Sequence, residues 1–373
     1  MSNIQGLQQP VHLITGALDE HGGISRYCRE LYKRLKERMP VRLCSLRPPP
    51  LARRFTFLEH LPLSVEPDEG QGIYHFTRIM GCALMLWQPV HPAVATVHDL
   101  GPLVCAEEAH AVNPFDALLF RLQLAGLRRM DAIITRSHYT RKTVYERLDI
   151  DPGKVHVAAG GIDLEHFQRV PQARAKLEQV YGIAQRPERY NLLYVGSEAP
   201  RKNLATLLQA VALLKADGIR ARLIKVGGPG HPKHRTAFLA RAEELHLNLG
   251  EDIILMGLVP DADLATFYSA ADVLVLPSLV EGFGFPVLEA MACGTPVACS
   301  NAGALPEVAG DAALLFEPHD ARGLAHVISV LLYDTDLRRH MMQRGLEQCR
   351  LFSWDRMATE TEAVYREILH PDT

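Results

Sequence analysis

The chain alternates short apolar runs with longer stretches in which apolar residues recur every three or four positions. Helices that connect the strands of a parallel sheet produce this alternation, so the pattern predicts repeated βαβ units. In the first half it predicts strands at residues 11–16, 41–46, 72–76, 93–100, 131–137 and 155–159, with helices at 23–39 and 114–130. In the second half it predicts strands at 191–197, 221–228, 252–257, 273–278 and 296–300, with helices that begin at residues 203, 234, 261 and 286.

A charged segment separates the two series of βαβ units. Residues 171–189 contain two prolines and a glycine but no apolar run, which is typical of a connector with a short helix. We therefore expect an N-terminal Rossmann-like domain at 1–170 and a C-terminal one at 171–352. The last segment, 353–373, has helical spacing and could return to pack on the first domain. In such α/β sheets, ligands bind beyond the carboxyl ends of the strands.

Composition and charge exclude several classes of protein. Of the 373 residues, 47% are hydrophobic and 22% charged, as in ordinary globular proteins. The formal charge of −3 provides no positive field for nucleic acid, so we expect no nucleic-acid partner. Seven cysteines without C-x-x-C spacing indicate reduced thiols rather than disulfides or a zinc site. The start lacks a signal-peptide pattern, and no window reaches the ~18 apolar residues of a membrane span, so we expect a cytoplasmic protein.

The most informative segment follows the predicted strand at 273–278. Gly282 and Gly284 permit positive φ angles and close approach of the backbone to a ligand, and Pro286 suits the first position of a helix. The free N–H groups at a helix N-terminus bind anions, so this loop is suited to a diphosphate. Glu281 precedes the helix, and Glu289 is expected in its first turn. The two carboxylates can therefore address different parts of one ligand.

Two further loops carry candidate ligand-binding groups. After the strand at 191–197, Gly196 is followed by Arg201 and Lys202, and guanidinium and ammonium groups both suit a diphosphate. After the first strand, Gly22 and Gly23 lead into a helix, where the backbone could approach a ligand. Alone, two adjacent cations are more often solvated surface charges, and a glycine pair is more often a simple turn.

Other strand ends add a histidine and a pair of aspartates. His98 ends the strand at 93–100, where its imidazole could hydrogen-bond a ligand, although a single histidine is usually structural. Leu258 directly follows the strand at 252–257. Asp261 and Asp263 have the spacing of a metal-binding pair, but aspartate also caps helices. We expect one of them to cap the helix that begins there, and we expect no metal ion.

The segment from Glu281 to Glu289, with Gly-Phe-Gly-Phe-Pro inside it, resembles the paired-glutamate motif of glycosyltransferase family 4. The resemblance covers nearly the whole chain. It implies the retaining mechanism and the GT-B fold of that family, in which two facing Rossmann-like domains with parallel sheets enclose a cleft. It also implies that the N-terminal domain binds the acceptor and the C-terminal domain binds the nucleotide sugar.

The resemblance assigns roles to individual residues. It places Glu281 beside the donor sugar and Glu289 on the ribose hydroxyls. The implied catalytic residues are Glu281, His98, Arg201 and Lys202. The implied donor-binding residues are Gly22, Gly23, Gly196, Gly282, Phe283, Gly284, Phe285, Glu289 and Leu258. Many relatives carry an arginine directly after the glycine at 196, whereas this chain has Ser197, so its diphosphate clamp would rest on Arg201 and Lys202.

The implied reaction is transfer of a hexose from a nucleotide diphosphate sugar, with retained anomeric configuration and with neither metal nor cofactor. GDP-mannose is favoured as the donor, and a UDP- or dTDP-sugar is possible. We expect a saccharide or lipid-linked acceptor in cell-surface polysaccharide synthesis, with residues 47–69 as its candidate binding region. Arg121, Arg128 and Arg129 could contact anionic lipid at the inner membrane surface, or they could form the basic edge of a core helix.

Two other kinds of protein would use the same residues. A second nucleotide-sugar enzyme, such as an epimerase or a phosphorolytic enzyme, would need no carbohydrate acceptor, and product analysis without an acceptor would identify it. A noncatalytic scaffold would bind nucleotide sugars without turnover. The presence of Glu281, His98, Arg201 and Lys202 together argues against the scaffold.

Overall fold

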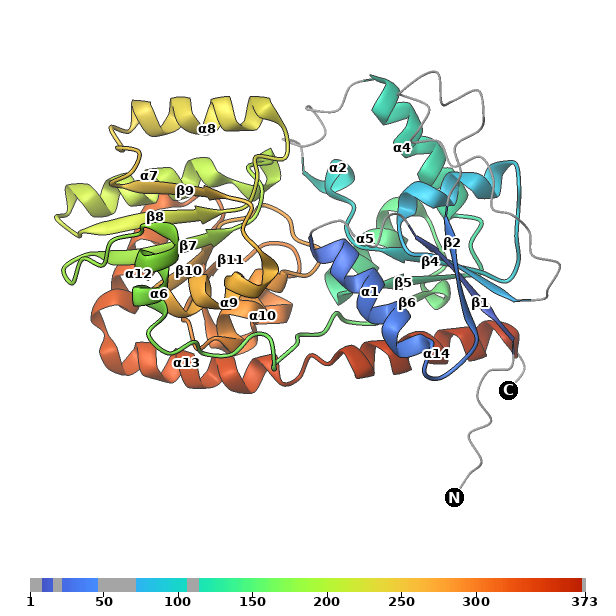
Figure 1. The fold of residues 1–373 in the computed structure, drawn as a ribbon. Coiled ribbons are helices and arrows are strands. Elements are labelled where there is room, and N and C mark those ends of the chain that lie inside the picture. Colours follow the sequence, from blue (N-terminus) through green and yellow to red (C-terminus); the bar gives the residue numbers. More distant parts are fainter. Residues whose placement is uncertain (1–8, 16–21, 46–71, 106–113, 371–373) are drawn as a thin grey trace. The chain divides into compact units, whose positions relative to one another are not determined.

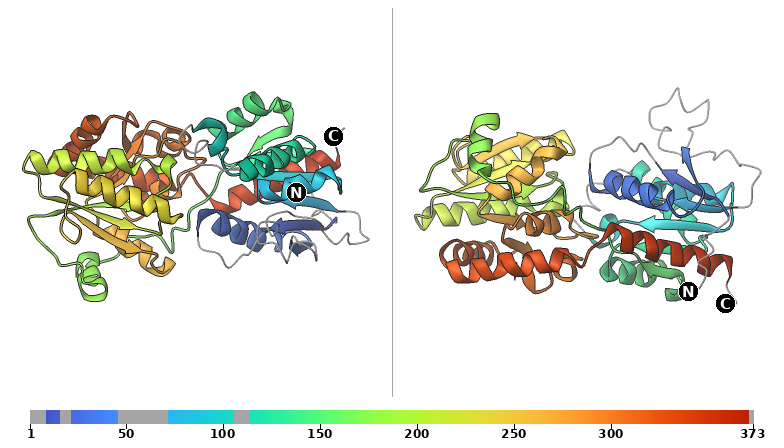
Figure 2. Two further views of the ribbon diagram at one scale, coloured as in Figure 1. Left: turned by 90° about the horizontal axis from the view of Figure 1, so that it is seen from above. Right: turned by 60° about the horizontal axis from the view of Figure 1, so that its bottom comes forward.

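The computed structural model describes residues 9–15, 22–45, 72–105 and 114–370. These residues form two compact units, and the chain divides after Gly161. The first unit also includes the C-terminal segment from Ser353. The second extends from Ile162 to Phe352 and also includes Val104 and Cys105. Each unit contains one six-stranded parallel sheet with helices (Figures 1 and 2). The predicted α/β class with parallel sheets is confirmed. No described helix combines the length and the apolar character that a membrane span requires.

The sheet of the first unit has the strand order β2-β1-β3-β4-β5-β6. All of its neighbouring strands run parallel. The strands are β1 (Val11–Thr15), β2 (Val41–Ser45), β3 (Ile73–Phe76), β4 (Ala93–Val97), β5 (Ala132–Thr135) and β6 (Val155–Val157). The helices are α1 (Gly23–Leu35), η3 (Ile79–Leu86), α2 (Gly101–Val104), α4 (Pro114–Leu127), α5 (His138–Leu148), η4 (Pro152–Lys154) and α14 (Trp354–Leu369).

One apolar cluster in the core of the first unit joins β4 to the two helices η3 and α4. Every residue of β4 is buried. Leu84 of η3 and Leu127 of α4 belong to the same apolar cluster as Val97. At Gly126 the backbone of α4 comes so close to Cys82 that a Cβ atom would overlap the Cys82 carbonyl group. Burial of each large apolar side chain stabilises the unit by about 1.5–3 kcal/mol, which holds the carboxyl end of β4 in place.

The sheet of the second unit has the order β12-β11-β10-β7-β8-β9. In chain order within this unit, the strands run outward in two directions from β7 and β10, which makes that pair the topological switch point of a Rossmann-like sheet. The strands are β7 (Tyr190–Val195), β8 (Ala221–Val226), β9 (Ile253–Gly257), β10 (Val273–Leu276), β11 (Val297–Ser300) and β12 (Ala313–Phe316). The helices are α6 (Ala173–Tyr181), η5 (Pro200–Lys202), α7 (Leu204–Ala216), α8 (Pro232–Glu244), α9 (Asp261–Ala270), α10 (Phe285–Ala292), α11 (Leu305–Ala309), η6 (Gly310–Ala312), α12 (Ala321–Tyr333) and α13 (Thr335–Cys349).

The C-terminal helix α14 is part of the first unit. Ser353 caps it, because its Oγ accepts hydrogen bonds from the backbone N–H groups of Asp355 and Arg356. Tyr365 OH lies 2.5 Å from His75 Nδ1 on β3, and Arg34 Nε of α1 donates to Asp355 Oδ1 at 3.1 Å. The last helix therefore adds to the core and the surface of the first unit, although residues 162–352 of the second unit separate it in sequence from Gly161.

All of the predicted strands are present, but several element boundaries and some elements differ from the predictions. The strand expected at 93–100 ends at Val97, since α2 begins at Gly101. The helix expected at 23–39 ends at Leu35. The alternation did not single out β12, α12 or α13. In β12 only the first and last of four residues are buried, so its apolar pattern is weak.

Candidate active site

The switch point of the second sheet brings two predicted ligand-binding loops together. The loop after β7 carries Arg201 and Lys202, and the loop after β10 carries Glu281. The backbone N–H of Leu279 donates to Arg201 O at 2.8 Å. Asn203 Nδ2 donates to Pro277 O at 3.0 Å, which ties the start of α7 to the end of β10. Strand order therefore places these loops side by side, and specific hydrogen bonds fix them.

Glu281 lies at the centre of a charged cluster. Its Oε1 is 2.5 Å from Lys202 Nζ and accepts a hydrogen bond from Ser278 Oγ at 2.7 Å. Its Oε2 is 3.7 Å from Arg201 Nη1. Burial by itself would raise the pKa of Glu281, but Lys202, Arg201 and the two hydrogen bonds outweigh it and hold the pKa below its usual value. The carboxylate is therefore ionised beside two cations, and the cluster keeps an excess positive charge.

The backbone around Glu281 requires glycine at two positions. Gly284 has a φ of 108°, and a Cβ there would lie 2.7 Å from Leu305 Cδ2. Gly303 has a φ of 62°, and its Cβ would lie 2.7 Å from both the N and the O of Glu281. Gly282 does not adopt a positive φ, so of these two predicted glycines only Gly284 has the special backbone conformation. The absence of a side chain at Gly303 and Gly284 thus allows the backbone conformation of Glu281 and of the start of α10.

Two predictions about α10 were wrong in detail. The helix begins at Phe285, so Pro286 is its second residue rather than its first. Glu289 is the fifth residue of the helix and so lies in its second turn rather than in its first. Its side chain is buried, and Tyr268 OH donates to its Oε2 at 2.5 Å. Tyr268 was not predicted as a site residue, since its position in α9 gives no local signal of this contact.

Phe283 and Phe285 contribute to the loop by packing. Both rings are buried, and their centroids lie 5.1 Å apart in an edge-to-face arrangement. Backbone groups are therefore what these two residues can offer a ligand. Leu258, in contrast, is 73% exposed directly after β9. Gly196 follows β7, and its backbone N–H donates to Val226 O at 2.9 Å.

A buried ionic network that the sequence did not reveal fixes the loop after β7. Glu198 Oε1 lies 2.9 Å from Lys225 Nζ and 2.6 Å from Arg235 Nη2. The Lys225 side chain has no exposed surface, and its Nζ also donates to Gly228 O at 3.1 Å. Burial by itself would raise the pKa of Glu198, but the hydrogen bonds from Arg235 and Lys225 lower the pKa by more than burial raises it. The net shift is downward, so the carboxylate stays ionised. The one sequence signal is a lysine within the apolar run of β8.

In the first unit, His98 is buried at the end of β4. Its Nε2 donates to Thr77 O at 2.8 Å, because a carbonyl oxygen can only accept. Burial and then the nearby Arg136 lower the pKa of His98 well below its usual value, so the ring is neutral. Nδ1 is therefore a hydrogen-bond acceptor, and it is buried without a partner among the described residues. An unsatisfied buried acceptor is suited to a ligand hydroxyl.

The remaining candidate residues have varied surroundings. Gly22 is the N-cap of α1, with a φ of 126°, and Gly23 is the first residue of that helix. The rest of this loop, residues 16–21, and the candidate acceptor region at 47–69 lie outside the described residues. Arg128 Nε donates to Leu148 O at 2.9 Å and Arg129 Nη1 to Met85 O at 2.9 Å, so both basic residues also bind carbonyl groups of their own unit.

The capping prediction for α9 was wrong. Pro260 is the N-cap, and Asp261 and Asp263 both lie in the first turn. Carboxylates in the first turn stabilise a helix through its dipole without capping it. Asp263 Oδ2 also accepts a hydrogen bond from Tyr181 OH at 2.6 Å, which connects α9 to α6.

Comparison with known proteins gives matches over most of the chain. The family model "Glycosyltransferase Family 4" matches residues 73–166, and "Glycosyl transferases group 1" matches residues 178–348. The chain is 32% identical over 331 residues to the O-antigen chain mannosyltransferase B of Escherichia coli. That match covers 84% of this chain and 83% of the relative.

Solved structures match the fold over nearly the whole length. Sucrose-phosphate synthase from Thermosynechococcus elongatus has a TM-score of 0.76 and 25% identity, and the match covers 98% of this chain and 100% of that one. HepE of Anabaena, in complex with UDP and glucose, has a TM-score of 0.75 and 16% identity, with 96% of this chain and 100% of that one covered.

Proposed function

Because the chain belongs to glycosyltransferase family 4, and is a glycosyltransferase with the GT-B fold, we propose that it transfers mannose from GDP-mannose to a saccharide or lipid-linked acceptor. The mannosyl donor and the role in cell-surface polysaccharide synthesis are supported by the similarity to the O-antigen chain mannosyltransferase B of Escherichia coli. A UDP- or dTDP-sugar is the alternative donor. The complex of HepE with UDP and glucose supports a nucleotide-sugar ligand for this fold.

The cluster of Lys202, Arg201 and Glu281 is the observation that carries the proposal. Two cations face one carboxylate, at 2.5 Å and 3.7 Å, so the site retains positive charge. The loop that contains Glu281 leads directly into α10, whose N-terminal backbone groups add the positive end of a helix dipole. A diphosphate has the charge and the acceptor oxygens that such a site requires.

In the proposed mechanism, the site stabilises the departing nucleoside diphosphate. Arg201, Lys202 and the N–H groups at the start of α10 supply fixed positive charge where negative charge develops. Glu281 orients the donor sugar. Its Oε1 is already occupied by Lys202 and Ser278, which makes it a poor candidate for a covalent nucleophile. The reaction would need no metal ion, because the cations do the same electrostatic work.

Three further residues are proposed to contact the donor. In the first unit, His98 Nδ1 would accept a hydrogen bond from a sugar hydroxyl, since it is a buried acceptor. Glu289 would bind the ribose hydroxyls, with Tyr268 holding one of its oxygens. Backbone groups near Leu258 would contact the base.

The proposal is tested by calorimetric titration of the protein with GDP-, UDP-, dTDP- and ADP-sugars. We expect one nucleotide class to bind and Lys202→Ala to weaken that binding about tenfold or more, because a charge-assisted contact to phosphate is lost. Lys176→Ala is the matched control, since Lys176 is an exposed lysine on α6 of the same unit. Equal affinity in the wild type, Lys202→Ala and Lys176→Ala, or no binding of any nucleotide sugar, would contradict the proposed site.

A further inference from the structure

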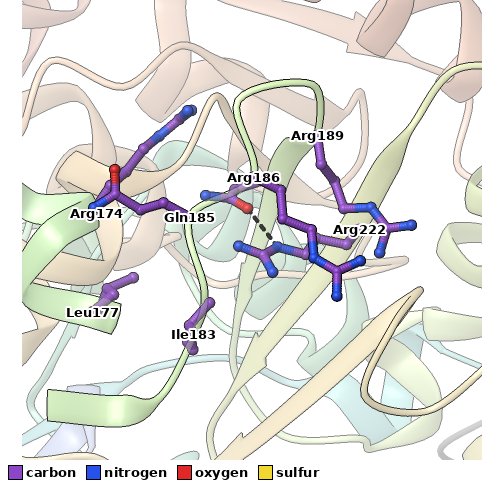
Figure 3. A pocket seen from close by; sticks show the side chains of 8 residues that line it. Arg174, Leu177, Ile183, Gln185, Arg186, Arg189 and Arg222 are labelled. Carbon is purple, nitrogen blue, oxygen red and sulfur yellow. Dashed lines mark hydrogen bonds between the residues drawn. The ribbon is translucent and has the colours of Figure 1, made fainter. Parts of the chain in front are cut away.

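The second unit has a shallow, positively charged pocket that is partly open to solvent. Arg174 of α6 contributes to it, together with Arg186 and Arg189 from the segment before β7 and Arg222 of β8. In Figure 3 the guanidinium groups of Arg186, Arg189 and Arg222 gather at one side of the pocket. Because the pocket is partly open, an anion can approach these guanidinium groups from solvent.

This pocket is distinct from the candidate active site. It lies at the beginning of β7 and β8, where Asn191 and Arg222 contribute to its lining. Arg201 and Lys202 follow the other end of β7, which ends at Val195. At ~3.3 Å per residue, the strand alone separates the two places by roughly 15 Å. A ligand bound here would therefore not overlap a nucleotide sugar at the switch point.

The lining of the pocket is strongly positive. It contains four arginines and no carboxylate. Two carboxylates outside the lining pair with some of these arginines: Asp272 with Arg174 at 2.6 Å, and Glu251 with Arg189 at 3.1 Å and with Arg186 at 3.7 Å. A third carboxylate, that of Glu178, accepts a hydrogen bond from Gln185 of the lining at 3.3 Å and forms no ion pair with these four arginines among the described residues. Counted over the ion pairs alone, four guanidinium groups against two carboxylates leave an excess of two positive charges.

Arg222 is the residue that most needs an anion. It is 5% exposed, and its hydrogen bonds go to two neutral oxygens, Asn191 Oδ1 and Ala184 O, each at 2.8 Å. Among the described residues it forms no ion pair. Burial, and then the neighbouring guanidinium groups of Arg189, Arg186 and Arg174, lower the pKa of Arg222, with Asp272 opposing them. A buried charge is stable only when it is paired, so the pocket lacks a counterion.

We propose that this arginine pocket binds a phosphate-bearing anion, as a second ligand site of the enzyme. Guanidinium groups bind phosphate oxygens in bidentate geometry, and three converging arginines can surround one phosphate group. A bound phosphate would neutralise the excess charge and supply the missing counterion of Arg222. The phosphate group can belong to a soluble molecule or to a lipid headgroup. Separate binding experiments with a soluble probe and with lipid vesicles distinguish these two sources.

Inorganic pyrophosphate, titrated calorimetrically at constant ionic strength, is the probe for the soluble source. Arg186→Ala removes an arginine whose side chain is 55% exposed, so the fold should tolerate it. Arg220→Ala is the matched control, because Arg220 is also exposed, pairs with Glu188 and precedes β8 without lining the pocket. Lys202→Ala weakens anion binding at the candidate active site only, so it distinguishes pyrophosphate bound there from pyrophosphate bound in the arginine pocket. Vesicles containing phosphatidylglycerol, in a flotation assay, are the probe for the lipid source.

We expect a class of pyrophosphate sites that persists in Lys202→Ala and Arg220→Ala but is weakened about tenfold in Arg186→Ala. Arg222→Lys, which keeps the charge but loses the bidentate geometry, should weaken the same class. If vesicles, and not pyrophosphate, bind in this variant-dependent manner, the proposed site is a headgroup site. If neither probe distinguishes Arg186→Ala from Arg220→Ala, the proposal is wrong.

Discussion

At the scale of single residues, burial decides the state of His98. The ring has lost its contact with water, so the neutral form is favoured and only one tautomer fits the carbonyl group of Thr77. His75 on β3 shows the same effect, because burial lowers its pKa to about 3. In the unfolded chain both rings have the ordinary pKa of 6.5. As the pH falls, both histidines are therefore protonated in the unfolded chain before they are protonated in the folded chain.

Both histidines make the free energy of unfolding depend on pH. Below pH 6.5 the unfolded state binds protons that the folded state excludes, so the free energy of unfolding falls as the pH falls. We expect His98→Gln to reduce this slope between pH 6 and 5 by about 1.4 kcal/mol per pH unit, measured by urea unfolding. His75→Gln should reduce it similarly, and the double variant by the sum. An unchanged slope in His98→Gln would show that the histidine is not excluded from water.

At the scale of elements, the loop after β7 depends on an ion pair with β8. Glu198 and Lys225 have almost no exposed side-chain surface, and their atoms lie 2.9 Å apart. Arg235 of α8 donates hydrogen bonds to both carboxylate oxygens of Glu198. The same loop carries Arg201 and Lys202. The position of the proposed diphosphate clamp is therefore set by residues that do not contact the ligand.

A double-mutant cycle tests this ion pair. Glu198→Gln should destabilise the second unit by about 3–5 kcal/mol, because it leaves Lys225 as a buried charge without a carboxylate. Glu198→Gln combined with Lys225→Met should recover part of that loss, since both charges are gone. The midpoints of chemical denaturation give the coupling energy. Strictly additive effects of the two substitutions would mean that the pair is not coupled.

At the scale of the whole molecule, the family and the fold are those of a glycosyltransferase, and the stereochemistry of the reaction is open to a direct test. We expect the product to have the same anomeric configuration as the donor sugar. The expectation rests on membership in family 4, and the surroundings of Glu281 favour a role in orienting the sugar. Proton NMR of the product, from a reaction run with EDTA, gives the anomer. A product with inverted configuration would contradict a retaining mechanism.

Much of the fold was predictable from the sequence, because the signals are local. The apolar run at Val273–Leu276 and the glycines and proline that follow it predict strand, loop and helix in that order. The helical spacing of the last segment predicted α14. Its packing on the first unit depends on Tyr365 meeting His75, 290 residues away in sequence, and no local pattern contains that contact.

The candidate site was predictable as a set of residues, but the way in which they meet depends on the folded chain. Local patterns in the sequence give the side chains available at each strand end: Arg201 and Lys202 after one strand, Glu281 after another. The contact between Lys202 and Glu281 spans 79 positions and exists because β7 and β10 are neighbours in the sheet. Strand order likewise decided the Glu198–Lys225 pair and the arginine pocket. The physical reason is that side-chain type and periodicity are properties of neighbouring residues, whereas burial and charge pairing depend on which strands lie side by side.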